Sequence, residues 1–201
     1  MKEHFLYGSD YTIVRPAETY NRRRVPGTFV IDGAYYTQID RILRGKPTIL
    51  HDDGMARAPF TYAEDFARAF VGLYGNTKAF GQAFHITTDE LITWKQITET
   101  IGRIVGIEPC FKCIPSEVLC RLLPRTCLGD TYGTIYTSKR FSVEGYSNKK
   151  IKEAVPGFEC RISFEEGIRR VLEFYDTHPA EKRISVEFNA EMDRLSEWNP
   201  K

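Results

Sequence analysis

The stretch DYTIVRP, from Asp10 to Pro16, decides the fold class of this chain. It is a β-branched run stopped by a proline. Because a proline forces the preceding residue out of the helical region, the stretch predicts a strand that leads into a loop. A second run, AFHIT from Ala83 to Thr87, predicts another strand, and helical patterns lie between the two. Strands that alternate with helices predict an α/β or α+β fold with parallel strand pairing.

The segment between these two strands predicts two helices and two short strands. The first helix covers 33–45 and ends at a glycine, with its apolar face formed by Tyr36, Ile39, Ile42 and Leu43. The second covers 63–74 and ends at Gly75-Asn76, with its apolar face formed by Phe66, Phe70, Leu73 and Tyr74. Short strands are predicted at 48–51 and 59–62, around the turn-forming DDG of 52–54. The segment 17–27 is predicted to be a loop.

Two capping boxes mark helices in the second half of the chain. Thr93 and Gln96 open a helix that stops at Gly106, and Ser163 and Glu166 open the closing helix, whose inner face contains Phe164, Ile168, Val171, Leu172 and Tyr175. A short strand within 108–115, a helix over 115–123 and a lysine-rich helical turn at 147–154 lie between them. The segment 128–140 is predicted to be a loop with room for one strand. The tail 179–201 is expected to pack loosely as a helix.

The composition fits an ordinary folded globule of one or two domains. The chain has 201 residues, of which 42% are hydrophobic and 27% charged. Its formal charge is +1, so no global field attracts nucleic acid, an anionic membrane or an acidic partner. The sequence has no run of apolar residues long enough to span a bilayer and no secretion signal, which favours a cytoplasmic protein without membrane contact.

The five cysteines do not predict a disulfide framework. Their number is odd and no secretion signal is present, so reduced thiols are expected. The pair Cys110-Phe-Lys-Cys113 has the spacing of a zinc or redox motif. Its surroundings predict a strand, however, in which residues three apart point to opposite faces. No metal site is therefore expected.

Four segments together resemble the C-terminal half of the NAD-dependent epimerase/dehydratase family, an extended branch of the short-chain dehydrogenases. They are, in chain order, TIVRPAETYN at 12–21, KPTILHDDGMARAPFTYAEDFARAFVGLYGN at 46–76, AFHITTDELITWKQI at 83–97 and VPGFECRISFEEGIRRVLEFY at 155–175. The resemblance implies the end of a Rossmann-like NAD(P)-binding fold joined to a small α+β substrate-binding domain. In this interpretation, Rossmann strands lie near 10–16 and 83–87, substrate-domain segments lie near 17–62 and 107–178, and 179–201 forms a tail.

The features that carry the family's chemistry do not occur in this sequence. Family members bind the cofactor pyrophosphate with a glycine-rich turn and a helix N-terminus, but no GxxGxxG or GxGxxG is present. They use a Tyr-x3-Lys pair, in which the lysine charge lowers the tyrosine pKa so that the phenol serves as a base. That pair normally precedes the strand that starts here at Asp10. We therefore expect no catalytic residue in this chain, and no tight binding of NAD or NADP.

Two segments have the spacing of the catalytic pair but not its context. Tyr74 and Lys78 stand on either side of Gly75-Asn76, which end a helix, so the two side chains cannot share one face. Tyr146 and Lys150 lie where a surface turn enters a short basic helix, which matches no catalytic position of the family. Both are interpreted as chance matches.

The resemblance places the loop after the Arg-Pro strand end beneath the nicotinamide and the substrate. Pro16, Ala17 and Thr19 would then contact the cofactor, and Glu18 and Tyr20 the substrate. The alternative is that Arg15 and Pro16 simply end a strand. Relatives that act on sugar nucleotides have an asparagine at the position of Glu18. A carboxylate there would repel a diphosphate.

A second departure concerns an arginine that holds the diphosphate in nucleotide-sugar relatives. Its position is occupied here by Ala58. Arg57, one residue earlier, would replace it as a substrate-binding residue only if the strand shifts, because neighbours on a strand face opposite sides. The alternative is that Arg57 is a solvated surface residue. The two losses argue against an ordinary UDP- or dTDP-sugar as substrate.

The remaining polar features are interpreted structurally. His51 is expected at a strand end and His85 in a buried hydrogen-bonded position, because neither has further ligands at metal-site spacing. The run Arg22–Arg24 is interpreted as a solvated loop rather than a nucleic-acid site, because one short run lacks a broad basic face.

The leading hypothesis is a truncated epimerase/dehydratase, the substrate-side half of an enzyme for a nucleotide-sugar-like or related hydroxyl-bearing small molecule, inactive by itself. The alternative is a non-catalytic binding module, or a subunit that completes its fold with a separate N-terminal chain. Either way, the strands at 10–16 and 83–87 are expected to lack neighbours. Ile13, Val14, Phe66, Phe70 and Phe84 should then be partly exposed, which favours self-association or a partner chain.

Overall fold

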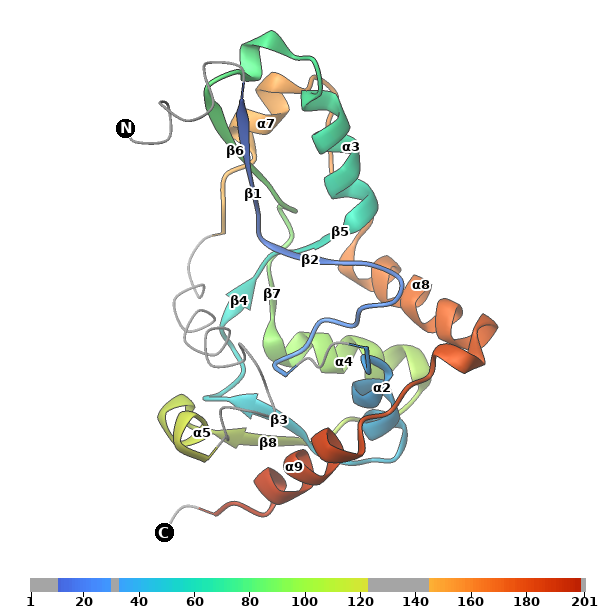
Figure 1. The fold of residues 1–201 in the computed structure, drawn as a ribbon. Coiled ribbons are helices and arrows are strands. Elements are labelled where there is room, and N and C mark those ends of the chain that lie inside the picture. The colour runs from blue at the N-terminus through green and yellow to red at the C-terminus, as the bar shows by residue number, and fades with distance from the viewer. Residues whose placement is uncertain (1–10, 30–32, 123–144, 200–201) are drawn as a thin grey trace.

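The computed structural model describes residues 11–29, 33–122 and 145–199 (Figure 1). Two groups of elements are visible. The upper group in Figure 1 contains β1, β6, α3 and α7, and the lower group contains α2, α4, α5, α9, β3 and β8. The helix α8 runs from the upper group to the lower one. The predicted α/β class with parallel strands is confirmed.

The upper group is built on two parallel strands. β1 (Thr12–Pro16) pairs with β6 (Gln82–Ile86), so that Val14 lies opposite Phe84 and Pro16 opposite Ile86. One face of this pair packs against Ala69 and Leu73 of α3 (Ala63–Leu73) and against Ile151 of α7 (Lys149–Ala154). The two predicted strands and their parallel pairing are confirmed, and α3 and α7 cover the same face.

The predicted loop over 17–27 was wrong in its first part. β2 (Glu18–Tyr20) forms within it and pairs in parallel with β5 (Phe60–Tyr62). No local pattern marks this strand, because a partner far along the chain stabilises it. A third parallel pair joins β3 (Thr48–His51) to β8 (Phe111–Ile114), and one antiparallel pair joins β4 (Arg57–Ala58) to β7 (Ile92–Thr93).

Three helices enclose the main hydrophobic core: α2 (Tyr36–Leu43), α4 (Trp94–Val105) and α8 (Phe164–Thr177). The capping box of α4 is confirmed, because the Gln96 N–H donates to Thr93 Oγ1 at 3.0 Å and the Thr93 N–H donates to Gln96 Oε1 at 2.7 Å. The helix ends at Gly106, whose φ is +74°. Only half of the second predicted capping box forms. The Ser163 hydroxyl accepts the Glu166 N–H, but the Glu166 carboxylate binds Arg170 instead of the Ser163 N–H.

The predicted apolar faces of α2 and α3 were too wide. Leu43, Phe70 and Tyr74 are 42%, 52% and 90% exposed. Helical spacing shows which residues share a stripe, but the width of the neighbouring elements decides how much of the stripe is covered. The expected exposure of Phe84 was also wrong, because that side chain is buried beneath α7 and α3.

The C-terminal tail packs firmly, so the loose packing predicted for it was wrong. α9 (Val186–Ser196) buries Phe188, Met192 and Leu195 against Ile49 of β3 and Leu119 of α5 (Ser116–Leu122). The buried Arg41 guanidinium donates to Asp193 at 2.8 Å and to Asn189 at 3.0 Å, which fixes α9 to α2. The short helices η1 (Thr77–Ala79) and η2 (Pro179–Glu181) complete the described elements. The prediction for 128–140 lies outside the described residues.

Asp65 connects the upper group to α8. Its side chain is in the first turn of α3 and is fully buried. Its carboxylate accepts the N–H of Arg161 at 3.1 Å and the N–H of Ile162 at 2.9 Å, and it also binds the Arg68 guanidinium. Hydrogen bonds to a charged, buried acceptor are among the stronger ones in proteins. This carboxylate therefore holds the segment that leads into α8 against the start of α3.

Asp65→Asn is expected to lower the free energy of unfolding by about 2–3 kcal/mol, because one acceptor oxygen becomes a donor that faces backbone N–H groups. Urea unfolding followed by circular dichroism measures this change. Glu64→Gln is the matched control, since Glu64 lies in the same turn but forms an exposed ion pair with Arg170 at 3.0 Å. The control should cost less than about 1 kcal/mol, and equal losses in the two variants would contradict the role of Asp65.

Candidate functional site

The carboxyl ends of β1 and β6 lie at one edge, because the strands are parallel and Pro16 is opposite Ile86. The chain continues from this edge into β2 on one side and into Thr87 and Thr88 on the other. Thr61 of β5 joins the two segments. It pairs with Thr19 in the β2–β5 ladder, accepts the Thr88 N–H at 2.9 Å and donates to Thr87 Oγ1 at 3.3 Å. Ligands of parallel α/β folds bind at such an edge.

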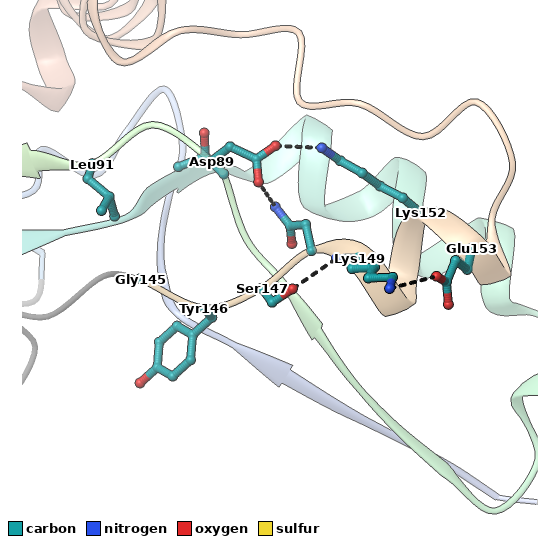
Figure 2. A pocket seen from close by; sticks show the side chains of 10 residues that line it. Asp89, Leu91, Gly145, Tyr146, Ser147, Lys149, Lys152 and Glu153 are labelled. Atoms are coloured by element: carbon teal, nitrogen blue, oxygen red, sulfur yellow. Dashed lines mark hydrogen bonds and ion pairs between the residues drawn. The ribbon is translucent and has the colours of Figure 1, made fainter.

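A cavity of about 770 Å³ opens beside this edge, as Figure 2 shows. It lies between the segment that follows β6 and the segment that leads into α7, and its lining residues are Thr88, Asp89, Leu91, Gly145, Tyr146, Ser147, Asn148, Lys149, Lys152 and Glu153. The charges in its wall are balanced, because Lys152 binds Asp89 at 2.6 Å and Lys149 lies 3.9 Å from Glu153. A cavity of this size accommodates a small molecule.

Asn148 fixes the wall of the cavity to the end of β6. Its buried side chain accepts the Thr87 N–H at 3.3 Å and donates to the Thr87 carbonyl and, at 3.1 Å, to Asp89 Oδ1. Sequence analysis missed this residue. The only local signal was an asparagine just before a short helix, which is also a common turn residue.

Tyr146 lies on the open face of the strand pair. Its ring stacks on His85, with 4.5 Å between ring centroids and 10° between ring planes. His85 Nδ1 is buried and has no hydrogen-bond partner within the described residues. Lys150 instead lies over the ring of Phe84, which faces the opposite side of the strand, and it donates to Gln82 at 2.9 Å. Tyr146 and Lys150 are therefore not arranged as an acid–base pair, and Tyr74 projects into solvent beyond the end of α3.

The residues predicted around the nicotinamide and substrate follow β1 directly. Pro16 is exposed, and Ala17, Glu18 and Thr19 are half-buried. The Glu18 carboxylate lies 3.9 Å from the Arg24 guanidinium, which also donates to the Thr19 carbonyl at 3.3 Å. Arg24 therefore partly offsets the negative charge of Glu18.

The rest of the arginine run also packs against the protein itself. Arg22 and Arg23 each lie 5.4 Å from the ring centroid of Phe174, and Arg23 binds Glu181 at 3.1 Å. The Tyr175 hydroxyl donates to the carbonyl of Arg23, and burial raises the pKa of this phenol to about 12. The run thus stabilises the end of α8.

Tyr20 is part of the core. Its side chain is 2% exposed, packs edge-on against Tyr62 with 5.3 Å between ring centroids, and donates to the Phe164 carbonyl at 3.3 Å. Burial holds the pKa of the Tyr20 phenol well above its usual range. A Cβ at Gly167 would lie 2.0 Å from the Tyr20 oxygen, so this helix position requires glycine. In this conformation Tyr20 offers almost no surface to a ligand.

Arg57 and Ala58 point to opposite sides of β4. Ala58 is 1% exposed and faces the main core, whereas Arg57 is exposed. Arg57 is not among the residues that line the cavity beside the β1–β6 edge. The core-facing side of β4 at this position is therefore occupied by the Ala58 methyl group.

Residues 11–29, 33–122 and 145–199 contain no group of side chains able to hold a metal ion. Cys110 and Cys113 are exposed, and Cys110 contacts the Gly45 carbonyl at 3.3 Å. Cys160 lies next to the candidate site, where its thiol donates to the Thr87 carbonyl at 3.4 Å, and burial raises its pKa to about 11. His51 is buried at the end of β3, and burial lowers the pKa of its imidazole.

The N-termini of the long helices do not fit a cofactor pyrophosphate. Thr93 caps α4, Ser163 caps α8 and Ser185 caps α9. The first turn of α3 contains Glu64 and Asp65, whose charges repel a phosphate. No described helix is long and apolar enough to cross a bilayer.

The chain is similar in sequence and fold to known proteins. A family model described as the NAD dependent epimerase/dehydratase family matches residues 4–86. A UDP-glucose 4-epimerase from Thermotoga maritima, solved with UDP-glucose, is 25% identical at a TM-score of 0.57, and the match covers 87% of this chain and 48% of that one. An epimerase from Methanothermobacter thermautotrophicus is 15% identical at a TM-score of 0.64, with coverage of 89% and 47%.

A UDP-glucuronic acid 4-epimerase from Bacillus cereus, solved with UDP-glucuronic acid and NAD, is 18% identical at a TM-score of 0.62, with coverage of 87% and 48%. At this identity the likeness shows the Rossmann-like fold alone. The chain thus spans about half the length of the solved structures that it matches.

Proposed function

We propose that this chain, which belongs to the NAD-dependent epimerase/dehydratase family, supplies the substrate-side half of such an enzyme and is inactive without a dinucleotide-binding half. The observation that carries the proposal is the edge formed by the ends of β1 and β6, with a cavity of about 770 Å³ beside it. The reaction class is hydride transfer through NAD or NADP at a carbon that bears a hydroxyl group. The residues of this chain would hold and orient the substrate.

In this proposal the residues after β1 meet the reacting groups. Pro16, Ala17 and Thr19 contact the nicotinamide end of the cofactor, and Glu18 faces the substrate. Tyr20 acts indirectly, because its buried ring holds β2 and β5 against α8. Arg57 would reach a substrate only from the outer side of β4.

The substrate class follows from the charges near this edge. Glu18 is only partly neutralised by Arg24, and the Ala58 methyl group provides no cation. Both features disfavour a diphosphate. The cavity offers hydroxyl and amide groups and two ammonium–carboxylate pairs, which suit a polyhydroxylated molecule with little negative charge. We propose such a hydroxyl-bearing, sugar-like substrate.

A non-catalytic binding module is the second candidate. The observation that favours it is that Lys150 lies over the ring of Phe84, on the face of the strand opposite to Tyr146, and that Tyr74 projects into solvent. Such a module would bind the same class of ligand in the same cavity, or complete its fold with a separate N-terminal chain. Nucleic acid is disfavoured, because the arginines of 22–24 pack against Phe174, Glu181 and Glu18.

The 201-residue chain alone is expected to bind NAD and NADH with a dissociation constant of about 1 mM or weaker, because no glycine-rich turn holds the pyrophosphate. Calorimetric titration measures this constant, with the Bacillus cereus epimerase, a structure solved with NAD, as the positive control. Micromolar affinity would show that this chain alone holds the cofactor, without a separate dinucleotide-binding half.

Glu18→Asn is expected to tighten the binding of UDP-glucose by about fivefold, because removing one negative charge near a diphosphate changes the interaction by roughly 1 kcal/mol. Titration at low ionic strength compares it with Glu187→Gln, an exposed control on α9. Unchanged affinity, or an equal gain in the control, would show that Glu18 does not face the substrate.

A further inference from the structure

A small cavity lies between α2, β3 and α9, in the lower group of elements in Figure 1. Its volume is about 20 Å³. Its polar walls are formed by Thr28, Gln38, Arg41 and Thr48, and its apolar walls include Met192 of α9. It shares no lining residue with the cavity beside the β1–β6 edge. We call it the Thr28 cavity.

The hydroxyl group of Thr28 is buried without a partner. The residue is 6% exposed, and its Oγ1 makes no hydrogen bond within residues 11–29, 33–122 and 145–199. A buried polar group that lacks a hydrogen bond lowers the stability of the folded state, and such groups are rare in native proteins. Because Thr28 lines the Thr28 cavity, a small polar molecule in that cavity would satisfy the hydroxyl group.

Two side chains of α2 bring further polar groups to this cavity. The Gln38 amide lies against the backbone of residue 27, since a Cβ at Gly27 would lie 2.1 Å from Gln38 Oε1. The Arg41 guanidinium has five N–H groups. Its Nη1 donates to two side chains of α9 and its Nη2 donates to the Pro47 carbonyl at 3.1 Å, so these bonds do not use the Nε–H. The cavity is therefore lined by donors and acceptors from two segments of the chain.

We propose that the Thr28 cavity binds a single water molecule, held by Thr28, Gln38 and Arg41. A water molecule needs roughly 10–15 Å³ of such space and two to four polar partners. The Thr28 cavity meets both requirements, and it is too small for an organic ligand. The charge of Arg41 is balanced by Asp193 at 2.8 Å, which favours a neutral occupant over an anion.

The water molecule would connect the segment that follows β2 to α2. Arg41 already joins α2 to α9, so the bound water would extend this hydrogen-bonded network to residue 28. Water-mediated hydrogen bonds of this kind are enthalpically nearly as good as direct ones. The inference is independent of the proposed function, because neither the residues after β1 nor the cavity beside the β1–β6 edge take part in it.

Thr28→Val tests the proposal by the sign of its effect, because valine has nearly the shape of threonine without the hydroxyl group. If the hydroxyl group binds a water molecule, the variant should lower the folding equilibrium constant by about fivefold. An unchanged or higher constant would overturn the proposal, since removing a buried hydroxyl group that has no partner costs nothing. Urea unfolding measures the constant. The control is Thr77→Val, at an exposed position of η1, which should change it by less than about twofold.

The second measurement is water-to-amide cross-relaxation in the NMR spectrum of the unmodified chain, which does not require the variant to fold. The Gln38 side-chain amide should show a cross-peak with water that has the sign of a long-lived contact. Absence of this cross-peak would overturn the proposal. So would an unfolding midpoint that is higher in chloride than in gluconate at equal ionic strength in the unmodified chain but not in Thr28→Val, since the occupant would then be an anion.

Discussion

The buried carboxylate of Asp65 is the interaction on which the rest of the structure depends. It accepts the N–H groups of Arg161 and Ile162 and so fixes the start of α8 to the start of α3. A charged acceptor that is desolvated can be stable only when its hydrogen bonds are satisfied, so the position of α8 is tightly specified.

The position of α8, which Asp65 fixes, in turn determines the geometry of the candidate site. Once α8 is fixed, its first N–H, that of Phe164, donates to Glu90 at 2.8 Å, and Cys160 reaches the Thr87 carbonyl. Asn148 holds the same stretch from the other side through Thr87 and Asp89. The segment after β6 is therefore held from two directions, which places one wall of the cavity at the carboxyl edge of the strand pair. A rigid wall suits the binding and orientation of a substrate.

The sequence was sufficient to predict features that depend on neighbouring residues. β1, β6 and the capping box of α4 each have a local cause: a proline stop, a β-branched run, and the spacing of Thr93 and Gln96. It was not sufficient for β2 or for the packing of α9, since both depend on distant partners, β5 for the strand and Arg41 for the helix. In the candidate site, the end of β1 at Pro16 was predictable from the sequence. Asn148 and the cavity were not, because their positions follow from folding contacts across 59 or more residues.

The central claim is that β1 pairs with β6 on one side only and is therefore an edge strand within the described residues, as a proposed substrate-side half requires. Hydrogen–deuterium exchange of the β1 amides tests it most directly, at a concentration where light scattering shows a monomer. The account predicts that alternate amides of residues 12–15 exchange rapidly, because one set faces β6 and the other faces the side on which no described strand pairs with β1. Slow exchange of both sets in the monomer would contradict the claim, since a strand within this chain would then already occupy the outer edge.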